Sequence, residues 1–285
     1  MSNPAATRQV GCELSFELAV PSRLALHVAV AGSATVLEER FRVVGATAGD
    51  EPVAVAAEHG GRIQLVDAGP GRLDVTYTAT VGPDGRWPPD APSSAPRPQR
   101  ERAAFGLEQL VALRQSRYCP SDQLAGLAAT TFGDLADPLA KANAIGEWVF
   151  ERLSYEPGAS RSTDTAIDTL LGGKGVCRDF AHLTIALLRA VGVPARLVAV
   201  YAPGLTPMDF HAVTEVWDGH GWLIVDSTRL APRSSLIRIA TGRDAADTAF
   251  ATVVEGDVEL LGAEVFAIVD GDLPADDHVS PWILD

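Results

Sequence analysis

The segment 175–194 sets the strongest limit on how this chain can fold, because it combines an apolar helix with a cysteine in its first turn. Apolar side chains recur at helical spacing between Cys177 and Val191, and Gly192-Val193-Pro194 ends the helix. The unpaired N–H groups and the positive end of the helix dipole favour a thiolate over a thiol at such a position. Cys177 is therefore a candidate nucleophile, although a cysteine at a helix start is, on its own, more often a small buried side chain.

A predicted β-hairpin carries a histidine and an aspartate on one face. Residues 210–217 and 222–226 are rich in β-branched and aromatic side chains, and Asp218-Gly219-His220-Gly221 between them has the composition of a turn. Pairing the two tryptophans that flank the turn puts Asp226 on the same face as His211, diagonally about 7 Å away. An aspartate there can hold the imidazole and leave its second ring nitrogen for a thiolate from the helix.

Around these residues the sequence resembles the transglutaminase-like superfamily, and within it bacterial proteins described as cysteine proteases. The matching motifs occur in the family's order: Leu153-Ser154-Tyr155-Glu156-Pro157-Gly158, Gly175-Val176-Cys177-Arg178-Asp179-Phe180-Ala181-His182, Gly192-Val193-Pro194-Ala195-Arg196, Phe210-His211-Ala212-Val213 and Gly221-Trp222-Leu223-Ile224-Val225-Asp226-Ser227-Thr228. Tyr118-Cys119-Pro120-Ser121-Asp122 is similar to the start of the family's core. Residues 1–90 are similar to the β-rich region that precedes the core in many bacterial members.

The resemblance implies an α+β fold with a papain-like, transglutaminase-like core, in which the nucleophile helix packs on an antiparallel sheet and an antiparallel β domain comes first. It implies that Cys177 is the nucleophile, His211 the general base and acid, and Asp226 the carboxylate that orients the histidine. The chain departs from the family in Ser227-Thr228-Arg229-Leu230, where many relatives have a proline directly after the aspartate and a small residue beyond the threonine. This departure concerns one wall of the substrate cleft.

Composition divides the chain into three parts. Residues 1–90 alternate apolar and polar side chains, which predicts an antiparallel β domain. Six prolines between Pro83 and Pro98 predict an extended linker or crossover, which we place at residues 91–112. Residues 113–285 then form the predicted transglutaminase-like core with C-terminal β-strands.

Helices and strands follow one another within the predicted core. Helices are expected to begin at Asp137-Pro138 and Thr163-Asp164, before the Cys177 helix. Besides the hairpin, strands are expected over residues 196–201, 250–254 and 259–269. We expect all of these strands in the one sheet against which the helix packs.

The bulk composition excludes several classes of function. A formal net charge of −14 without a basic run argues against nucleic-acid binding. The N-terminus lacks the apolar run of a signal peptide and no stretch could span a bilayer, so we expect a cytoplasmic protein without membrane contacts. Three widely spaced cysteines predict reduced thiols. Cys177 and His182 have the wrong helical spacing for zinc and no nucleotide-binding glycine loop occurs, so neither a metal nor a cofactor is expected.

The sequence favours a thiol-dependent acyl-transfer enzyme that attacks a protein, a peptide or a small amide and forms a thioester. Hydrolysis, as by a peptidase or amidase, is favoured over crosslinking, because nothing in the sequence indicates a site that excludes water. Transfer to an amine, and a non-catalytic binding module that retains the triad, are the alternatives. The β domain could also support a homo-oligomer. The Cys177 N–H is one expected oxyanion donor, whereas the second donor and the substrate-binding residues are not assigned.

Overall fold

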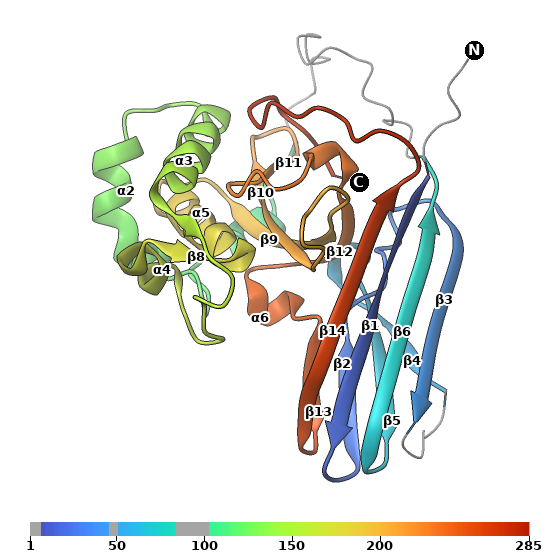
Figure 1. The fold of residues 1–285 in the computed structure, drawn as a ribbon. Helices are drawn as coiled ribbons and strands as arrows, with labels where there is room; N and C mark the ends of the chain where they lie inside the picture. Colours follow the sequence, from blue (N-terminus) through green and yellow to red (C-terminus); the bar gives the residue numbers. More distant parts are fainter. Residues whose placement is uncertain (1–6, 46–50, 84–102, 285) are drawn as a thin grey trace, which may run out of the picture.

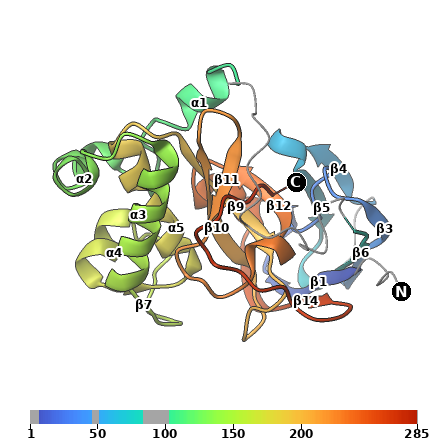
Figure 2. The same ribbon diagram turned by 90° about the horizontal axis from the view of Figure 1, so that it is seen from above.

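The structure is a computed structural model that describes residues 7–45, 51–83 and 103–284. Figure 1 shows a long β sandwich beside a mixed core of helices and strands. Seen from above in Figure 2, the helices lie on one side of the core sheet and the sandwich on the other. The α+β class expected from the sequence is confirmed.

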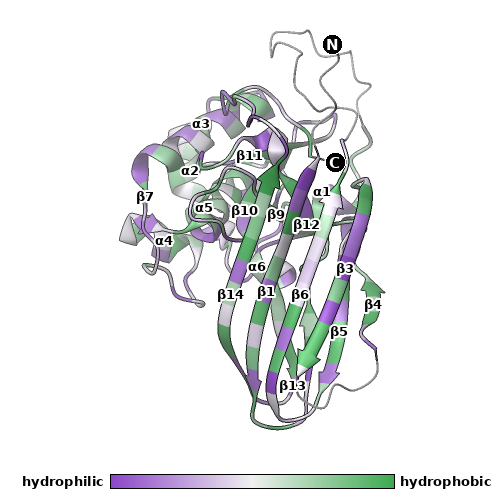
Figure 3. Cartoon of the chain, turned by 45° about the vertical axis from the view of Figure 1, so that its right-hand side comes forward, coloured by the Kyte–Doolittle hydropathy of each residue, from purple (hydrophilic) through white to green (hydrophobic). Residues whose placement is uncertain are grey.

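The sandwich consists of two four-stranded sheets with the orders β14-β1-β6-β3 and β13-β2-β5-β4. Alternate side chains of β1, β2, β5 and β6 are buried between the sheets, as Leu14, Phe16 and Leu18 show. Figure 3 shows this alternation as hydrophobic and hydrophilic bands along the strands. The strand bounds are β1 Arg8–Leu18, β2 Ser22–Leu26, β3 Val36–Gly45, β4 Val53–Ala56, β5 Arg62–Ala68, β6 Gly71–Val81, β13 Ala251–Glu255 and β14 Val258–Val269, with a 3-10 turn at Glu58–Gly60.

The two C-terminal strands lie in the sandwich and not in the core sheet, so the placement predicted for residues 250–254 and 259–269 is wrong. β13 pairs with β2, and β14 runs antiparallel to β1, with Val258 opposite Leu18 and Val269 opposite Arg8. An alternating pattern identifies a strand and its buried face, but every unpaired sheet edge offers the same backbone groups. The periodicity therefore could not select the partner strand. The predicted core over residues 113–285 is corrected accordingly, because its last two strands belong to the sandwich.

The end of the predicted linker contains a helical turn. α1 (Leu107–Val111) lies inside the range 91–112, and the backbone N–H of Gly106 donates to the Gln109 side chain at its first turn. The proline-rich residues 84–102 lie outside the described residues.

The core sheet has the order β11-β10-β9-β12, and α5 packs on it with residues 179–189 buried, while its first two residues and its last residue are only partly buried. A two-stranded parallel ladder, β7 with β8, lies beside the start of α5. The bounds are α2 Ala125–Phe132, α3 Pro138–Arg152, β7 Ser154–Tyr155, α4 Ala166–Gly172, β8 Lys174–Gly175, α5 Cys177–Ala190, β9 Ala195–Tyr201, β10 His211–Trp217, β11 Trp222–Val225, β12 Ile237–Gly242 and α6 Ala245–Thr248, with 3-10 turns at Ser121–Leu124 and Arg233–Ser235.

The predicted helix starts are explained by their caps. The Asp137 carboxylate accepts the Ala140 N–H at 2.9 Å, so α3 begins where the sequence predicts. α4 begins later than expected, because Thr165 is its N-cap residue and forms a capping box with Asp168.

One hydrophobic cluster joins the sandwich to the core sheet, and Tyr201 of β9 lies at this junction. Its ring stacks on Tyr77 of the sandwich with centroids 6.3 Å apart, and its hydroxyl donates to the Val28 carbonyl at 2.8 Å. Ile237 and Ile239 of the core are buried in the same cluster. The core sheet is thus braced by the sandwich on the face opposite the helices.

Among the helices of the described ranges 7–45, 51–83 and 103–284, none has the length and apolar character needed to cross a bilayer.

Replacing Gly256 tests whether the turn between β13 and β14 packs on β2. Gly256 has φ of 105°, and an added Cβ would lie 2.1 Å from Ser22 Oγ. Gly71 has φ of 116° with open space around it. Both Gly256→Ala and Gly71→Ala carry the backbone cost, but Gly256→Ala also forces β2 aside and should cost about 1–3 kcal/mol more. Urea unfolding measures the difference, and equal losses would contradict this packing.

Candidate active site

Cys177 is the first residue of α5, and a buried carboxylate holds the backbone in front of it. Asp179 is only 1% exposed, and its Oδ2 accepts the Val176 N–H at 2.8 Å. An added Cβ on Gly175 would lie 2.6 Å from the Asp179 Cβ, so this cap requires glycine there. The Cys177 thiol is partly buried, with Sγ 3.9 Å from the Phe210 carbonyl oxygen. The helix start is therefore rigid, and its thiol faces the beginning of β10.

His211 and Asp226 form a buried pair at one end of the hairpin. His211 Nε2 lies 2.9 Å from Asp226 Oδ2, and the other carboxylate oxygen accepts the Thr228 N–H at 2.9 Å and its hydroxyl at 2.7 Å. β10 and β11 pair with Trp217 opposite Trp222. This is the register predicted from the sequence, and it places the two side chains on one face.

The environment of this pair favours its charged form. Burial alone would lower the pKa of His211, but the charge and hydrogen bond of Asp226, together with the Cys177 thiol, raise it to about 10. Burial would raise the pKa of Asp226, but the His211 charge and the hydrogen bonds from His211 and Thr228 lower it overall. The site therefore suits an imidazolium held by a carboxylate.

The structure brings Cys177, His211 and Asp226 together. Because Asp226 occupies Nε2 of His211, the ring nitrogen left for the thiol is Nδ1. Nδ1 makes no hydrogen bond of ordinary geometry, but Cys177 lies close enough to raise the pKa of His211. Two contacts tie helix to strands: Thr214 Oγ1 donates to the Ala181 carbonyl at 3.4 Å, and the Thr184 and Ser227 hydroxyls lie 2.7 Å apart.

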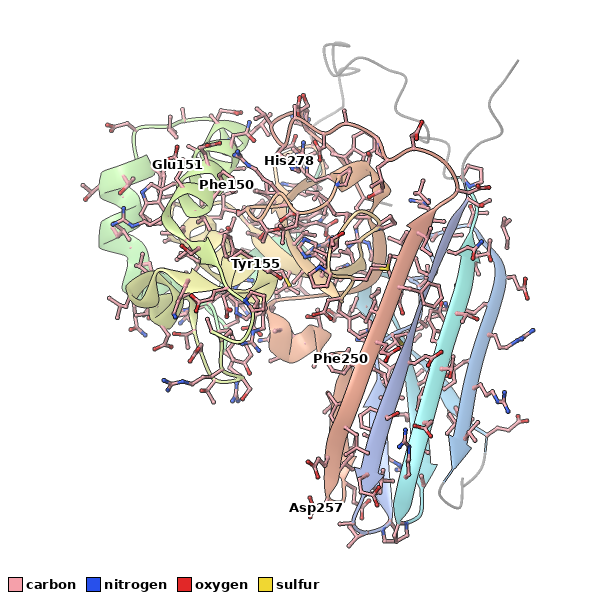
Figure 4. The ribbon with its side chains drawn as sticks, viewed as in Figure 1. Phe150, Glu151, Tyr155, Phe250, Asp257 and His278 are labelled. Atoms are coloured by element: carbon pink, nitrogen blue, oxygen red, sulfur yellow. The ribbon has the colours of Figure 1, made fainter. Side chains whose placement is uncertain are left out.

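Tyr155 is a site residue that sequence reasoning missed. Residue pairing in the β7–β8 ladder sets Tyr155 opposite Gly175, two residues before the cysteine. Burial, followed by the Cys177 and Asp209 charges, raises the pKa of Tyr155 to about 12, while a hydrogen bond from the Cys177 backbone N–H opposes the rise. In Figure 2, β7, which carries Tyr155, lies at the outer edge of the core beside the helices, and Figure 4 labels the side chain. The sequence motif 153–158 contains Tyr155, but a two-residue parallel ladder leaves no local signal that would place this side chain near Cys177.

The remaining cysteines and His182 lie outside the site. Burial raises the pKa of both Cys12 and Cys119 to about 12, so both stay thiols. His182 stacks on Tyr118 and accepts the Ala245 N–H at 3.1 Å, and burial lowers its pKa to about 3. These groups stabilise the core and take no part in the triad.

Other places in the described part of the chain do not compete with this site. No group of three or more His, Cys, Asp or Glu side chains there could hold a metal ion. A cavity of about 1040 Å³ lies between the sandwich and the core, lined among others by His27, His59 and Arg196, but it includes none of the three triad residues.

Comparisons with known proteins agree with the fold. The sequence profile of the Transglutaminase-like superfamily matches residues 125–227. The crystal structure of a proposed cysteine protease from Cytophaga hutchinsonii is 31% identical and superposes with a TM-score of 0.83, covering 98% of this chain and 96% of that one.

Two curated relatives match over shorter stretches. An uncharacterized protein of Mycobacterium leprae is 28% identical over 48% of this chain and 52% of its own length. A protein-glutamine gamma-glutamyltransferase of Pseudomonas aeruginosa is 33% identical over 42% of this chain and 22% of its own length. The chain thus spans about half, or less, of these relatives.

A buried helix that begins at a cysteine and packs on an antiparallel sheet defines a papain-like class of fold. Within that class, the chain belongs to the transglutaminase-like superfamily.

The raised pKa of His211 predicts how the stability of the pair depends on pH. Because the folded pKa lies above the ordinary value of 6.5, the stabilisation is complete below pH 6.5 and is lost as the pH rises toward 10. The stability advantage of the wild type over Asp226→Asn should therefore narrow across this window, as measured by urea unfolding. Asp67→Asn, which removes a surface pair with Arg23, should show a constant difference. Parallel curves for wild type and Asp226→Asn would contradict the prediction.

Proposed function

We propose that this protein is a thiol-dependent acyl-transfer enzyme that cleaves amide or peptide bonds through Cys177, His211 and Asp226. The observation that carries the proposal is the His211 ring, which Asp226 holds by Nε2 while Nδ1 remains for the thiol at the start of α5. Membership in a superfamily with a neighbour described as a proposed cysteine protease supports an enzymatic role.

The proposed reaction has two halves. The Cys177 thiolate attacks the carbonyl carbon, and the tetrahedral intermediate collapses to a thioester as the C–N bond breaks. His211, kept protonated by Asp226, gives its proton to the departing nitrogen. The neutral imidazole then takes a proton from the acceptor, which attacks the thioester. The C–S bond breaks, and the Cys177 thiolate and the His211 imidazolium are restored. Asp226 fixes the ring orientation throughout.

Tyr155 completes the proposed oxyanion site. The ladder pairs Tyr155 with Gly175, two residues before Cys177, and the Cys177 backbone N–H acts on the pKa of the Tyr155 hydroxyl. We therefore place both groups around the carbonyl oxygen of a substrate. A pKa of about 12 keeps the phenol protonated at neutral pH, and it can donate to the oxyanion.

The acceptor is proposed to be water. Transfer to an amine is the alternative, which the similarity to a protein-glutamine gamma-glutamyltransferase supports. Ammonia release from glutamine peptides, measured with and without a primary amine, separates them: turnover that needs the amine would favour transfer. A binding module would show no turnover with either.

A cytoplasmic location and homo-oligomerisation through the β domain stay proposals, to be tested by fractionation and sedimentation.

Alkylation with iodoacetamide tests the proposed nucleophile without a substrate. At pH 6.5 we expect selective labelling of Cys177 by peptide mapping, because burial keeps Cys12 and Cys119 protonated. His211→Ala should slow Cys177 labelling about tenfold or more, since the thiolate loses its cationic partner. His220→Ala, in the hairpin turn, is the matched control and should label as the wild type does. Equal labelling of all three cysteines in every variant would contradict the proposal.

Tyr155→Phe tests the second oxyanion donor. The substitution keeps the ring that packs 5.9 Å from Phe180 and removes only the hydroxyl. We expect kcat to fall about 10²-fold with little change in KM, because the donor acts on the transition state. Cys177 alkylation by iodoacetamide should stay near the wild-type rate. A change confined to KM would assign Tyr155 to substrate binding instead.

A further inference from the structure

The loop after Asp226 contains a residue in a backbone conformation that side chains rarely adopt. Arg229 has φ of 57°, in the left-handed region that favours glycine. It follows Thr228, whose N–H and hydroxyl both donate to Asp226. Left-handed residues other than glycine persist where surrounding contacts enforce them, and they cluster at functional sites.

Two side chains of α3 hold Arg229. Its Nη2 pairs with the Glu147 carboxylate, and its guanidinium lies 4.1 Å from the centroid of the Phe150 ring. Phe150 is labelled on α3 in Figure 4. Arg229 is 26% exposed, whereas Glu147 is 47% and Phe150 39% exposed, so this contact lies at the surface and the guanidinium is its least exposed member. A cation held by an aromatic face and a carboxylate together is well suited to fix a loop.

Arg229 acts at the outer end of the loop. At its inner end, Val225 packs against Gly146 of α3, where an added Cβ would lie 3.0 Å from Val225 Cγ1. Ser227 is held by Thr184 of α5 at 2.7 Å. Thr228 lies between these anchors and Arg229. It donates two hydrogen bonds to Asp226 Oδ1, the carboxylate oxygen that does not contact His211.

We infer that Arg229 is a positioning residue, whose clamp on Glu147 and Phe150 holds the loop 226–230 so that Asp226 keeps its hydrogen bond to His211. The effect on turnover rests on the proposed function, whereas the effect on His211 does not. The departure from the family noted in the sequence at this position thus has a structural role in the site.

Arg229→Gly separates this role from folding, because glycine relieves the backbone strain while removing the clamp. We expect a melting temperature equal to or above that of the wild type, together with a fall in kcat of about tenfold at unchanged KM, a size usual for loss of a supporting group. Arg229→Lys should restore part of the kcat through Glu147. Glu147→Gln should lower kcat in the wild type and have no further effect in Arg229→Gly.

The matched control is Arg152→Ala, which removes a similar contact of α3, with the guanidinium 4.7 Å from the Trp148 ring centroid. Titration of His211 by NMR needs no substrate: the His211 pKa should fall in Arg229→Gly and stay unchanged in Arg152→Ala. An unchanged His211 titration in Arg229→Gly, or additive effects of Arg229→Gly and Glu147→Gln, would overturn the clamp. A wild type without turnover or selective Cys177 labelling would refute the proposed function, and the His211 titration would still decide the clamp.

Discussion

The hydrogen bond between His211 and Asp226 is the contact on which the rest of the site depends. Both side chains are buried, and a charged pair is stable there only if its remaining polar atoms are satisfied. Thr228 provides two hydrogen bonds to the second carboxylate oxygen, which requires the loop after Asp226 to turn back sharply. The register of β10 with β11 and the path of this loop together hold one imidazole in place.

The nucleophile is positioned by a second, separate device. Asp179 caps the start of α5 from within the helix, and Gly175 leaves room for it. The same Gly175 pairs with Tyr155, so the parallel ladder places a phenol beside the start of α5, where Cys177 influences its pKa. A short segment before the helix thereby sets both the thiol and its neighbouring donor.

The sandwich contributes rigidity to this arrangement. Tyr201, on the strand next to β10, stacks and hydrogen-bonds into the sandwich, so the core sheet is held from the side opposite α5. The chain returns to the sandwich through β13 and β14, and its last residues lie again on the core, where the Ile224 N–H donates to the Trp282 carbonyl at 2.8 Å. The chain thus passes from the sandwich to the core and back, and one hydrophobic cluster joins the two.

The sequence by itself determined the local elements and the placement of His211 relative to Asp226: the α5 start at Cys177, the Asp137 cap, and a hairpin whose period of two puts the two side chains on one face. Such features depend on neighbours in the chain and on periodicity, which the sequence displays directly. Only the tertiary structure decided the partners of β13 and β14, the approach of Tyr155 to Cys177, and the contact of Arg229 with α3. These join residues far apart in the chain, and strand edges and charged side chains accept many partners, so packing alone selects among them.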